Sequence, residues 1–105
     1  MKHRDMRAAR AKVDESGHCR VCGTSQNVEA AHILPRSRIS AGAGEDPRNI
    51  VPLCGNQGCA CHRAFDEGTL DLLPYLTREE QAYAVELVGI AEAYRRVTGS
   101  RELAA

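Results

Sequence analysis

The pattern of apolar and polar positions divides the chain into two helical ends and a punctuated middle. In residues 77–98 a broad apolar face recurs at helical spacing, which predicts a long helix that we expect to act as scaffold. Thr77 with Glu80 three residues later matches a capping box at its start, and Gly99 can close it. In residues 1–15 the apolar stripe is thinner, but the absence of glycine and proline predicts a second, basic helix.

The middle of the chain, residues 16–60, is rich in glycine, proline and asparagine, which favours short strands and turns over helices. Residues 28–34 are the first predicted strand and residues 50–53 the second, and the second carries a proline that suits a sheet edge. Between them, residues 36–48 form a polar stretch without a hydrophobic pattern. We therefore expect a loop there with no hydrophobic reason to be ordered.

A helix of two turns is predicted over residues 61–67, and Gly68 is placed to supply the left-handed residue that follows a helix end. Together the elements predict an α+β fold, with a short β-hairpin and helix between the N-terminal helix and the long C-terminal one. The length leaves room for a single domain, taken as residues 1–105, whose core we place at residues 17–70.

Composition indicates that this domain needs more than a hydrophobic core. Three tyrosines, one phenylalanine and no tryptophan leave mainly small and aliphatic side chains to bury. Burial contributes roughly 25 cal/mol per Å² of apolar surface, against a backbone entropy cost of about 1–2 kcal/mol per residue. A chain of this kind is marginally stable, which predicts an additional cross-link or a bound metal.

Charge and hydropathy exclude several classes of protein. Fourteen basic and fourteen acidic residues give a net charge of zero, which excludes a globally basic nucleic-acid binder. The charge is nevertheless divided: residues 1–48 carry nine bases and six acids, and residues 49–105 carry five and eight, so one face can still be basic. No apolar run approaches the roughly 18 residues of a membrane span, and nothing resembles a signal peptide, which predicts a cytoplasmic protein without a membrane partner.

Five cysteines provide the candidate cross-link. An odd count without an export signal argues against a disulfide framework, and the spacing favours a metal. Cys19 and Cys22, followed at once by a glycine, have the form of a zinc knuckle, in which two thiolates converge on one ion. In the second cluster three cysteines compete for two places: Cys54, Cys59 and Cys61. We predict a zinc site with four cysteine ligands, and the alternative is buried free thiols with a redox-labile pair.

Four blocks follow one another along the chain: CRVCG (19–23), VEAAHILPRS (28–37), DPRNIVPLCG (46–55) and CHRAFDEG (61–68). In their order and spacing they resemble the HNH endonuclease family, the ββα-metal nucleases, and in particular its small zinc-bound phage-type members. The resemblance covers residues 17–70, about half of the chain, and any single block would be weak on its own. It implies a zinc-stapled ββα-metal core and a metal-dependent nuclease that acts on DNA.

The resemblance also implies roles for single residues, carried over by position. His32 resembles the general base, and Asn49 resembles the residue that ties down the loop between the strands. His62 resembles a ligand of the catalytic ion, Mg²⁺ or Mn²⁺, and Asp66 matches the place of a second ligand on the same helix. The i, i+4 spacing of these two residues puts both side chains on one helix face, so both can reach one ion.

For the structural Zn²⁺, phage-type members often place six residues between the third cysteine and a Cys-His pair. The resemblance therefore implies this ligand set: Cys19, Cys22, Cys54 and Cys61. Cys59 is then the spare cysteine, although an exchange of Cys59 for Cys61 stays open, and His62 could displace a cysteine as the fourth ligand. The candidates for binding phosphates are four arginines: Arg36, Arg38, Arg48 and Arg63.

These residue types suit phosphodiester hydrolysis, since a neutral imidazole can accept a proton from water and a divalent ion can act as a Lewis acid on a phosphate. One position departs from the family: where a His or Asp ligand usually precedes the general base, the chain has Ala31, which cannot ligate. On a strand, Glu29 shares the face of Ala31 and could approach the vacated place, while His32 points to the other face. The residues alone also allow His32 as a hydrogen-bonded core histidine and Asp66 as polar surface.

The resemblance to the HNH family therefore implies a metal-dependent DNA endonuclease with His32 as its general base. One alternative is a zinc-stabilised module that binds DNA or protein and is weak or inactive in catalysis because of Ala31. Another alternative keeps the nuclease as an accessory to phage terminase or other DNA-packaging proteins in a bacterial host. The zero net charge agrees with that alternative, because a partner could supply the affinity for DNA.

Overall fold

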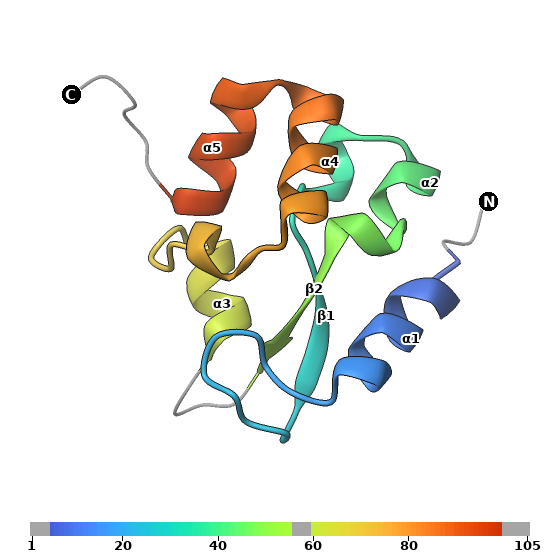
Figure 1. Ribbon diagram of the computed structural model, residues 1–105, viewed down its shortest axis with the longest axis vertical. Helices are drawn as coiled ribbons and strands as arrows, with labels where there is room; N and C mark the ends of the chain where they lie inside the picture. The colour runs from blue at the N-terminus through green and yellow to red at the C-terminus, as the bar shows by residue number, and fades with distance from the viewer. Residues whose placement is uncertain (1–4, 56–59, 100–105) are drawn as a thin grey trace.

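The computed structural model describes residues 5–55 and 60–99 (Figure 1). They form an α+β fold, as the sequence predicts, with helices around a two-stranded antiparallel hairpin. None of the helices described is both long and apolar enough to cross a membrane. In chain order, with η for a 3₁₀ turn, the elements are α1 (Arg7–Ser16), β1 (Val28–His32), η1 (Arg36–Arg38), α2 (Ala41–Gly44), η2 (Pro47–Asn49), β2 (Ile50–Cys54), α3 (Cys61–Asp66), η3 (Leu73–Tyr75), α4 (Arg78–Val88) and α5 (Ile90–Thr98).

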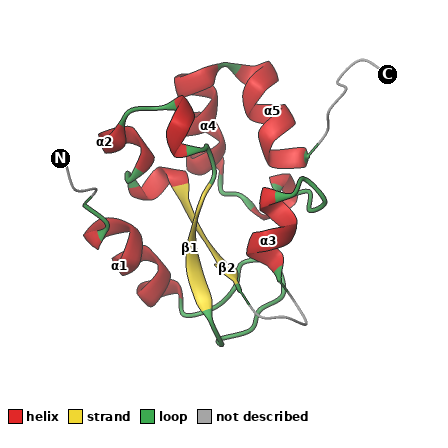
Figure 2. Ribbon diagram, turned by 180° about the vertical axis from the view of Figure 1, so that it is seen from behind, coloured by secondary structure: helices red, strands yellow, loops and turns green. Residues whose placement is uncertain are grey.

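The hairpin sets the distance between the two candidate sites. β1 pairs with β2 so that Val28 lies opposite Cys54 at one end and His32 lies opposite Ile50 at the other. Figures 1 and 2, which view the molecule from opposite sides, place α1 and α3 on the two sides of this hairpin. The cysteine ligands and the candidate general base are therefore held at opposite ends of the same pair of strands.

Side chains of β1 alternate between two hydrophobic clusters, because each face of the hairpin is covered by a helix. Val28 and Ala30 face α1 and complete a small cluster with three buried residues: Ala9, Val13 and Ile50. Ala31 faces the other way, into the larger cluster that contains Phe65 of α3. The alternation continues at His32, whose side chain therefore leaves the strand on the α1 side.

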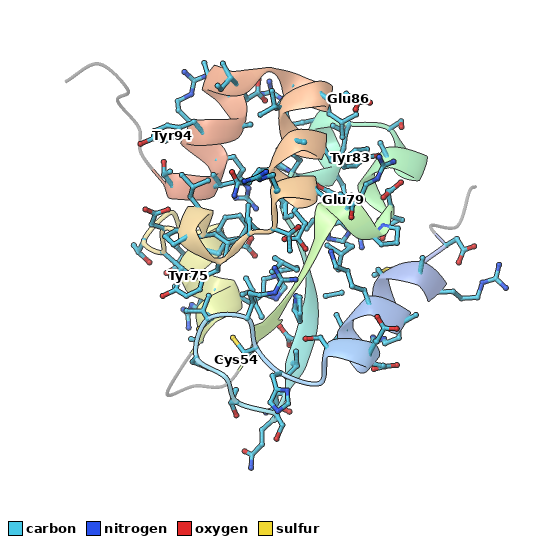
Figure 3. The ribbon with its side chains drawn as sticks, viewed as in Figure 1. Cys54, Tyr75, Glu79, Tyr83, Glu86 and Tyr94 are labelled. Carbon is cyan, nitrogen blue, oxygen red and sulfur yellow. The ribbon has the colours of Figure 1, made fainter. Side chains whose placement is uncertain are left out.

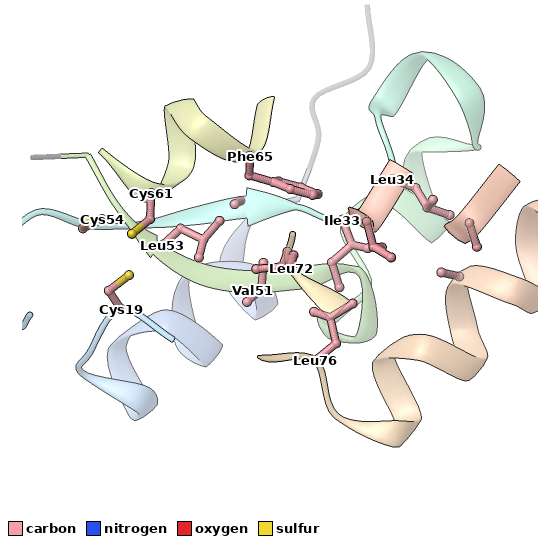
Figure 4. Close-up of a cluster of buried hydrophobic side chains, with 14 residues drawn as sticks. Cys19, Ile33, Leu34, Val51, Leu53, Cys54, Cys61, Phe65, Leu72 and Leu76 are labelled. Carbon is pink, nitrogen blue, oxygen red and sulfur yellow. The ribbon is translucent and has the colours of Figure 1, made fainter. Parts of the chain in front are cut away.

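The larger cluster is the main core, and it extends from the cysteines towards the C-terminal helices (Figure 4). Its largest side chain is that of Phe65, the chain's only phenylalanine, which is 1% exposed. Figure 4 shows the sulfur atoms of Cys19 and Cys61 turned towards each other at one edge of this core, beside Leu53. The cysteine cluster thus closes the end of a core that is poor in aromatic residues.

The prediction of one long helix over residues 77–98 is wrong, because the chain turns at Gly89. This glycine has a φ of 87° and a ψ of 161°, a conformation that residues with a Cβ rarely adopt. α4 and α5 therefore lie side by side (Figures 1 and 2). The capping box of Thr77 and Glu80 is confirmed, with both of its hydrogen bonds present, and Gly99 ends α5 with a φ of 74°.

The first helix and the first strand are shorter than predicted. α1 begins at Arg7, and residues 1–4 of the predicted helix lie outside the described residues. β1 ends at His32, two residues early. The backbone N–H and C=O of Leu34 bind the side chain of Asn49 and not a neighbouring strand. β1 therefore ends where hydrogen bonds to the side chain of Asn49 replace the hydrogen bonds between strands.

β2 and α3 agree with the prediction to within one residue. β2 runs one residue further, to Cys54, and is buried along its whole length, Pro52 included. α3 ends at Asp66, one residue early, and Gly68 takes the left-handed φ of 80° that the sequence indicates.

Residues 36–48, predicted as a polar loop without a hydrophobic reason to be ordered, contain more regular structure than a loop. The segment forms two 3₁₀ turns and the short helix α2, and polar groups hold it in place. Ser40 caps α2, and Asp46 caps η2 by accepting the backbone N–H of Arg48 at 2.9 Å. Tyr83 reaches over from α4, as Figure 3 shows, and its hydroxyl donates to the carbonyl of Ala43 at 3.4 Å. Because these bonds join polar groups, the hydrophobic pattern carries no sign of them.

Candidate active site and cysteine cluster

Four cysteines from three separate segments converge at one end of the hairpin. Their sulfur atoms all lie within 4.8 Å of one another, and those of Cys22 and Cys54 are 3.6 Å apart. Sulfurs bound tetrahedrally at about 2.3 Å from one ion would be about 3.8 Å apart, so the spacing suits a single four-coordinate metal. The set consists of Cys19 and Cys22 from the loop after α1, Cys54 at the end of β2, and Cys61 at the start of α3.

The loop that carries the first two cysteines favours thiolate ligands. Gly23 has a φ of 80° and donates its N–H to the carbonyl of Cys19 at 3.0 Å, which closes a tight turn. Burial raises the pKa of the Cys19 thiol, but backbone N–H groups of Cys22, Val21 and Cys54 outweigh burial and bring the pKa below its ordinary value. Metal binding requires the deprotonated sulfur, so these N–H groups act in favour of a bound ion.

The sequence leaves two alternative zinc ligands open, Cys59 in place of Cys61 and His62 in place of a cysteine, and the structure can be compared with both. Cys61 lies in the cluster, while Cys59 lies outside the described residues. His62, next in sequence to Cys61, is not among these clustered ligands. Its Nδ1 is 2.7 Å from Oε1 of Glu29 on β1. Among the residues described, the four sulfur ligands therefore need no contribution from this histidine.

His32 lies at the other end of the hairpin, in contact with a carboxylate that the sequence did not bring to attention. Its Nε2 is 3.1 Å from each carboxylate oxygen of Glu45. Glu45 directly precedes Asp46, the residue that caps η2. Nε of Arg36 is 3.3 Å from the Glu45 carboxylate. The side chain of His32 is 15% exposed and that of Glu45 is 6% exposed. His32 is thus a half-buried imidazole with a charged partner, and not a histidine enclosed by hydrocarbon.

Asn49 fastens the loop that carries these groups. Its side chain is 1% exposed, and its Oδ1 accepts the N–H of Leu34 at 2.8 Å. Its Nδ2 donates to the carbonyls of Leu34 at 3.2 Å and Gly44 at 3.0 Å. One side chain thereby joins the chain just after His32 to the residue just before Glu45.

The third group of polar side chains lines an open cleft beside α3. Nε2 of His62 is 3.5 Å from Oδ2 of Asp66 one turn later, and Glu29 approaches the other ring nitrogen. Arg63 and Glu67 complete the polar lining. Within the described parts of the chain, only the cysteine quartet brings three or more His, Cys, Asp or Glu ligand atoms within 4.8 Å of one another. The possible metal ligands in this cleft therefore lie on different sides of the His62 ring and are not gathered around one point.

The structure does not bring His32 and His62 together. Glu29, the partner of His62, is three residues from His32, which is about 10 Å along a strand, and it leaves the other face of β1. Ala31 is fully buried in the core beside Phe65, so no polar group fills its place. Glu29 reaches towards His62 and away from that position.

Arg96 of α5 connects the two polar groups. Its Nη2 lies 3.3 Å from Oδ1 of Asp66 and 3.4 Å from the carbonyl oxygen of His32. Its Nε donates to the carbonyl of Ile33 at 2.9 Å, and its guanidinium carbon lies 4.2 Å from the centre of the Phe65 ring. A permanent positive charge therefore stands beside Asp66, where it competes with a cation for that carboxylate.

Comparison with known families decides how these groups are to be interpreted. Residues 19–70 match the family model described as HNH endonuclease. Residues 19–70 belong to the HNH endonuclease family. Comparisons with curated proteins and with solved structures gave no match. The matched segment runs from the first cysteine of the cluster to just beyond α3, so it contains the hairpin, His32, His62 and the four clustered cysteines.

In this HNH domain each arginine proposed to contact phosphate is already paired with a carboxylate. The pairs are Arg36 with Glu45 at 3.3 Å, Arg38 with Glu92 at 2.6 Å, Arg48 with Asp46 at 3.0 Å and Arg63 with Glu67 at 3.3 Å. Of the four, Arg36 alone lies beside His32. The arginines are thus distributed over different elements of the domain.

Sequence reasoning missed Glu45 and Arg96. Neither belongs to a motif block at a recognised spacing, and both act through contacts between distant parts of the chain. A glutamate between a glycine-rich segment and a proline-containing turn, and an arginine on a predicted scaffold helix, have no local signal that links them to the HNH residues.

Proposed function

We propose that this HNH domain hydrolyses phosphodiester bonds of DNA in a reaction that depends on a divalent cation, with His32 as the general base. The observation that supports it best is the imidazole of His32 at the end of β1, held by the Glu45 carboxylate and by a loop that Asn49 fastens. A neutral imidazole that takes the proton of an attacking water typically contributes about 10²–10⁴-fold to the rate. Asn49 contributes by keeping the backbone around His32 in one conformation.

His62 and Asp66 are the proposed ligands of the catalytic cation, with Glu29 as a third donor. One imidazole and two carboxylates are a donor set that accepts Mn²⁺ and, through the oxygens, Mg²⁺. When bound, such an ion supplies Lewis acidity to a phosphate oxygen. Glu29 lies at Nδ1 of His62 and Asp66 at Nε2, so a shared ion requires the imidazole or one of the carboxylates to rotate to a new position.

The DNA backbone is proposed to cross the end of β1 near Arg96. That residue joins Asp66 to the backbone carbonyl of His32 through a single nitrogen atom, so Asp66 and the backbone of His32 lie at the same end of the strand. Arg36, beside the imidazole of His32, is the first candidate for a phosphate contact. A phosphate there would compete with Glu45 for the guanidinium of Arg36.

The test is nicking of supercoiled plasmid DNA with Mg²⁺ or Mn²⁺, comparing the wild-type protein with His32→Ala. We expect the substitution to lower the nicking rate by at least about 100-fold, the loss of a general base. His18→Ala is the matched control, because that histidine is exposed at the start of the cysteine loop and should leave the rate unchanged. Equal cleavage by wild type and His32→Ala would disprove the assignment of the base.

A second candidate function is a zinc-stabilised module that binds DNA without cleaving it. Two observations favour it: Ala31 is buried in the core, and His32 and Glu29 leave opposite faces of β1. Binding that weakens steeply with salt, without turnover in any divalent ion, would support this function over the nuclease. The further alternative, an accessory to phage DNA packaging, stays a prediction that co-purification with a packaging ATPase would test.

A further inference from the structure

Three polar or charged side chains are buried in the described part of the chain, and two of them have an evident structural purpose. Glu80 binds two cations that join separate elements, and Asn49 fastens a loop. The third, Glu45, faces the imidazole of His32. Burying a carboxylate costs free energy unless charged or hydrogen-bonding groups compensate it, so a buried carboxylate aimed at the proposed base calls for an explanation.

We propose that Glu45 is a positioning residue that fixes the tautomer of His32, so that the proton stays on Nε2 and Nδ1 presents its lone pair to the attacking water. This inference deepens the proposed function and rests on it for its catalytic meaning. An ionised carboxylate can only accept hydrogen bonds, and both of its oxygens are 3.1 Å from Nε2. Nε2 must therefore be the donor, which in a neutral ring leaves Nδ1 as the base.

Arg36 agrees with this assignment. Its Nε lies 3.3 Å from Nε2 of His32 and 3.3 Å from Oε2 of Glu45, and a guanidinium can only donate. A ring nitrogen that carries a proton cannot accept from Arg36, so the guanidinium proton goes to the carboxylate. Among the described residues Nδ1 of His32 has no hydrogen-bond partner. One carboxylate thus satisfies both donors and leaves the second ring nitrogen available.

The loop geometry explains how Glu45 is held. Glu45 ends α2 and donates its backbone N–H to the carbonyl of Ala41 at 3.1 Å. The residue before it, Gly44, is bound through its carbonyl by Nδ2 of Asn49 at 3.0 Å. Asn49 therefore holds the backbone of the carboxylate as well as the backbone that follows the imidazole. The side chain of Asn49 thereby holds the backbones next to Glu45 and His32 in a fixed position relative to each other.

The proposed step transfers one proton to His32 and changes no oxidation state. Water loses a proton to Nδ1 of His32, its oxygen forms the new bond to phosphorus, and the bond from phosphorus to the departing oxygen breaks. The departing oxygen takes a proton from solvent. The proton on Nε2 stays there, and the ionised Glu45 stabilises the imidazolium that forms, as a buried carboxylate does behind a catalytic histidine.

The first measurement is the ¹⁵N spectrum of the imidazole ring of His32 in the folded, metal-loaded protein without DNA, near pH 8. We expect the Nε2–H tautomer in the wild type and a mixture of tautomers in Glu45→Gln, because a side-chain amide can either donate or accept. The Nδ1–H tautomer in the wild-type protein would overturn the inference, whether or not the variant folds.

The second measurement is the rate of plasmid nicking. Glu45→Gln should lower kcat by about 100-fold or more with KM changed less than about threefold, and Glu45→Asp should retain part of the lost rate. Glu86→Gln, the same change at an exposed position of α4, is the control for altered net charge and should leave kcat unchanged. A Glu45→Gln variant with wild-type kcat and tautomer would overturn the inference.

The two measurements separate this inference from the proposed function. A wild-type protein without cleavage activity in which Glu45→Gln still shifts the tautomer of His32 would refute the nuclease and support the positioning role. Cleavage that needs His32 but not Glu45 would support the nuclease and refute the positioning role.

Discussion

The guanidinium of Arg20 and the carboxylate of Glu80 are joined by two hydrogen bonds of 2.9 and 3.0 Å, although 60 positions separate the residues. Arg20 stands between the first two cysteines of the cluster, and Glu80 lies in the first turn of α4. Nζ of Lys12 from α1 lies 2.6 Å from the same carboxylate. One glutamate, 2% exposed, therefore ties the cysteine loop and two helices together.

The ion pairs of Glu80 with Arg20 and Lys12 make the free energy of unfolding of the domain depend on pH. Burial raises the pKa of the Glu80 carboxyl, but Arg20, Lys12 and the N–H of Thr77 outweigh burial and hold the pKa at about 2, below the ordinary 4.5. Because the folded pKa lies below the unfolded one, the ionised carboxylate stabilises the fold above about pH 4.5, and this contribution is lost as the pH falls towards 2. The shift corresponds to about 3 kcal/mol. In urea unfolding, the stability difference between wild type and Glu80→Gln should shrink accordingly from pH 6 to pH 2.5.

Protonation of the cysteines and loss of metal also occur in acid, so the two proteins are compared over the part of this pH range in which both keep their metal and a cooperative transition. Glu79→Gln provides the matched control, because Glu79 is exposed in the same helical turn. Its stability difference from wild type should stay nearly constant across the same range of pH. A constant difference for Glu80→Gln as well would contradict the role of this carboxylate.

The sequence could predict half of what Glu80 does. Thr77 and Glu80 are three residues apart, so the capping box is a local pattern that spacing reveals. The bonds to Arg20 and Lys12 depend on how α1, the cysteine loop and α4 come together, and no spacing along the chain encodes that. The same reason explains why Glu45 was missed.

The candidate site was predictable to a similar extent. Spacing and family resemblance singled out the four cysteines that the fold brings together, and strand alternation placed His32 and Glu29 on different faces. The break at Gly89 was not predictable, because the apolar helical spacing continues through it and only the backbone conformation shows the turn. Which carboxylate faces His32 depends on the fold of residues 36–48, which polar bonds hold in place.

Loss of a cluster cysteine should unfold the domain. We expect Cys19→Ser to lose one bound zinc equivalent and its cooperative thermal transition, because a structural zinc site contributes on the order of 10 kcal/mol of apparent binding free energy. Metal content by mass spectrometry and thermal melts with and without a strong chelator measure both effects. Cys59→Ser, at a position outside the described residues, is the comparison and should keep its metal. A wild-type melt that a chelator leaves unchanged would refute the structural role of the metal.

Two glycines with the same backbone conformation should respond differently to alanine. Gly17 and Gly99 both have a φ of 74°, so alanine strains either position by about 1 kcal/mol. A Cβ at Gly17 would meet nothing within 4 Å, whereas at Gly99 it would collide with the carbonyl of Gly68, only 2.8 Å from its carbon. Gly99→Ala should therefore cost about 1–3 kcal/mol more than Gly17→Ala in chemical unfolding. Equal losses would mean that α5 and the turn after α3 separate easily.

The hydrogen bonds of Asn49 give the most direct test of the loop that carries the proposed site. Asn49→Ala removes the partner of three buried backbone groups, two on Leu34 and one on Gly44, and should cost about 2–4 kcal/mol. Asn49→Asp retains the acceptor for the Leu34 N–H but loses both donors. Amide hydrogen exchange should therefore show Leu34 unprotected in the alanine variant and partly protected in the aspartate variant. If Leu34 stays protected in Asn49→Ala and stability falls by less than about 0.5 kcal/mol, the loop is held by other contacts and Asn49 does not set the geometry of His32 and Glu45.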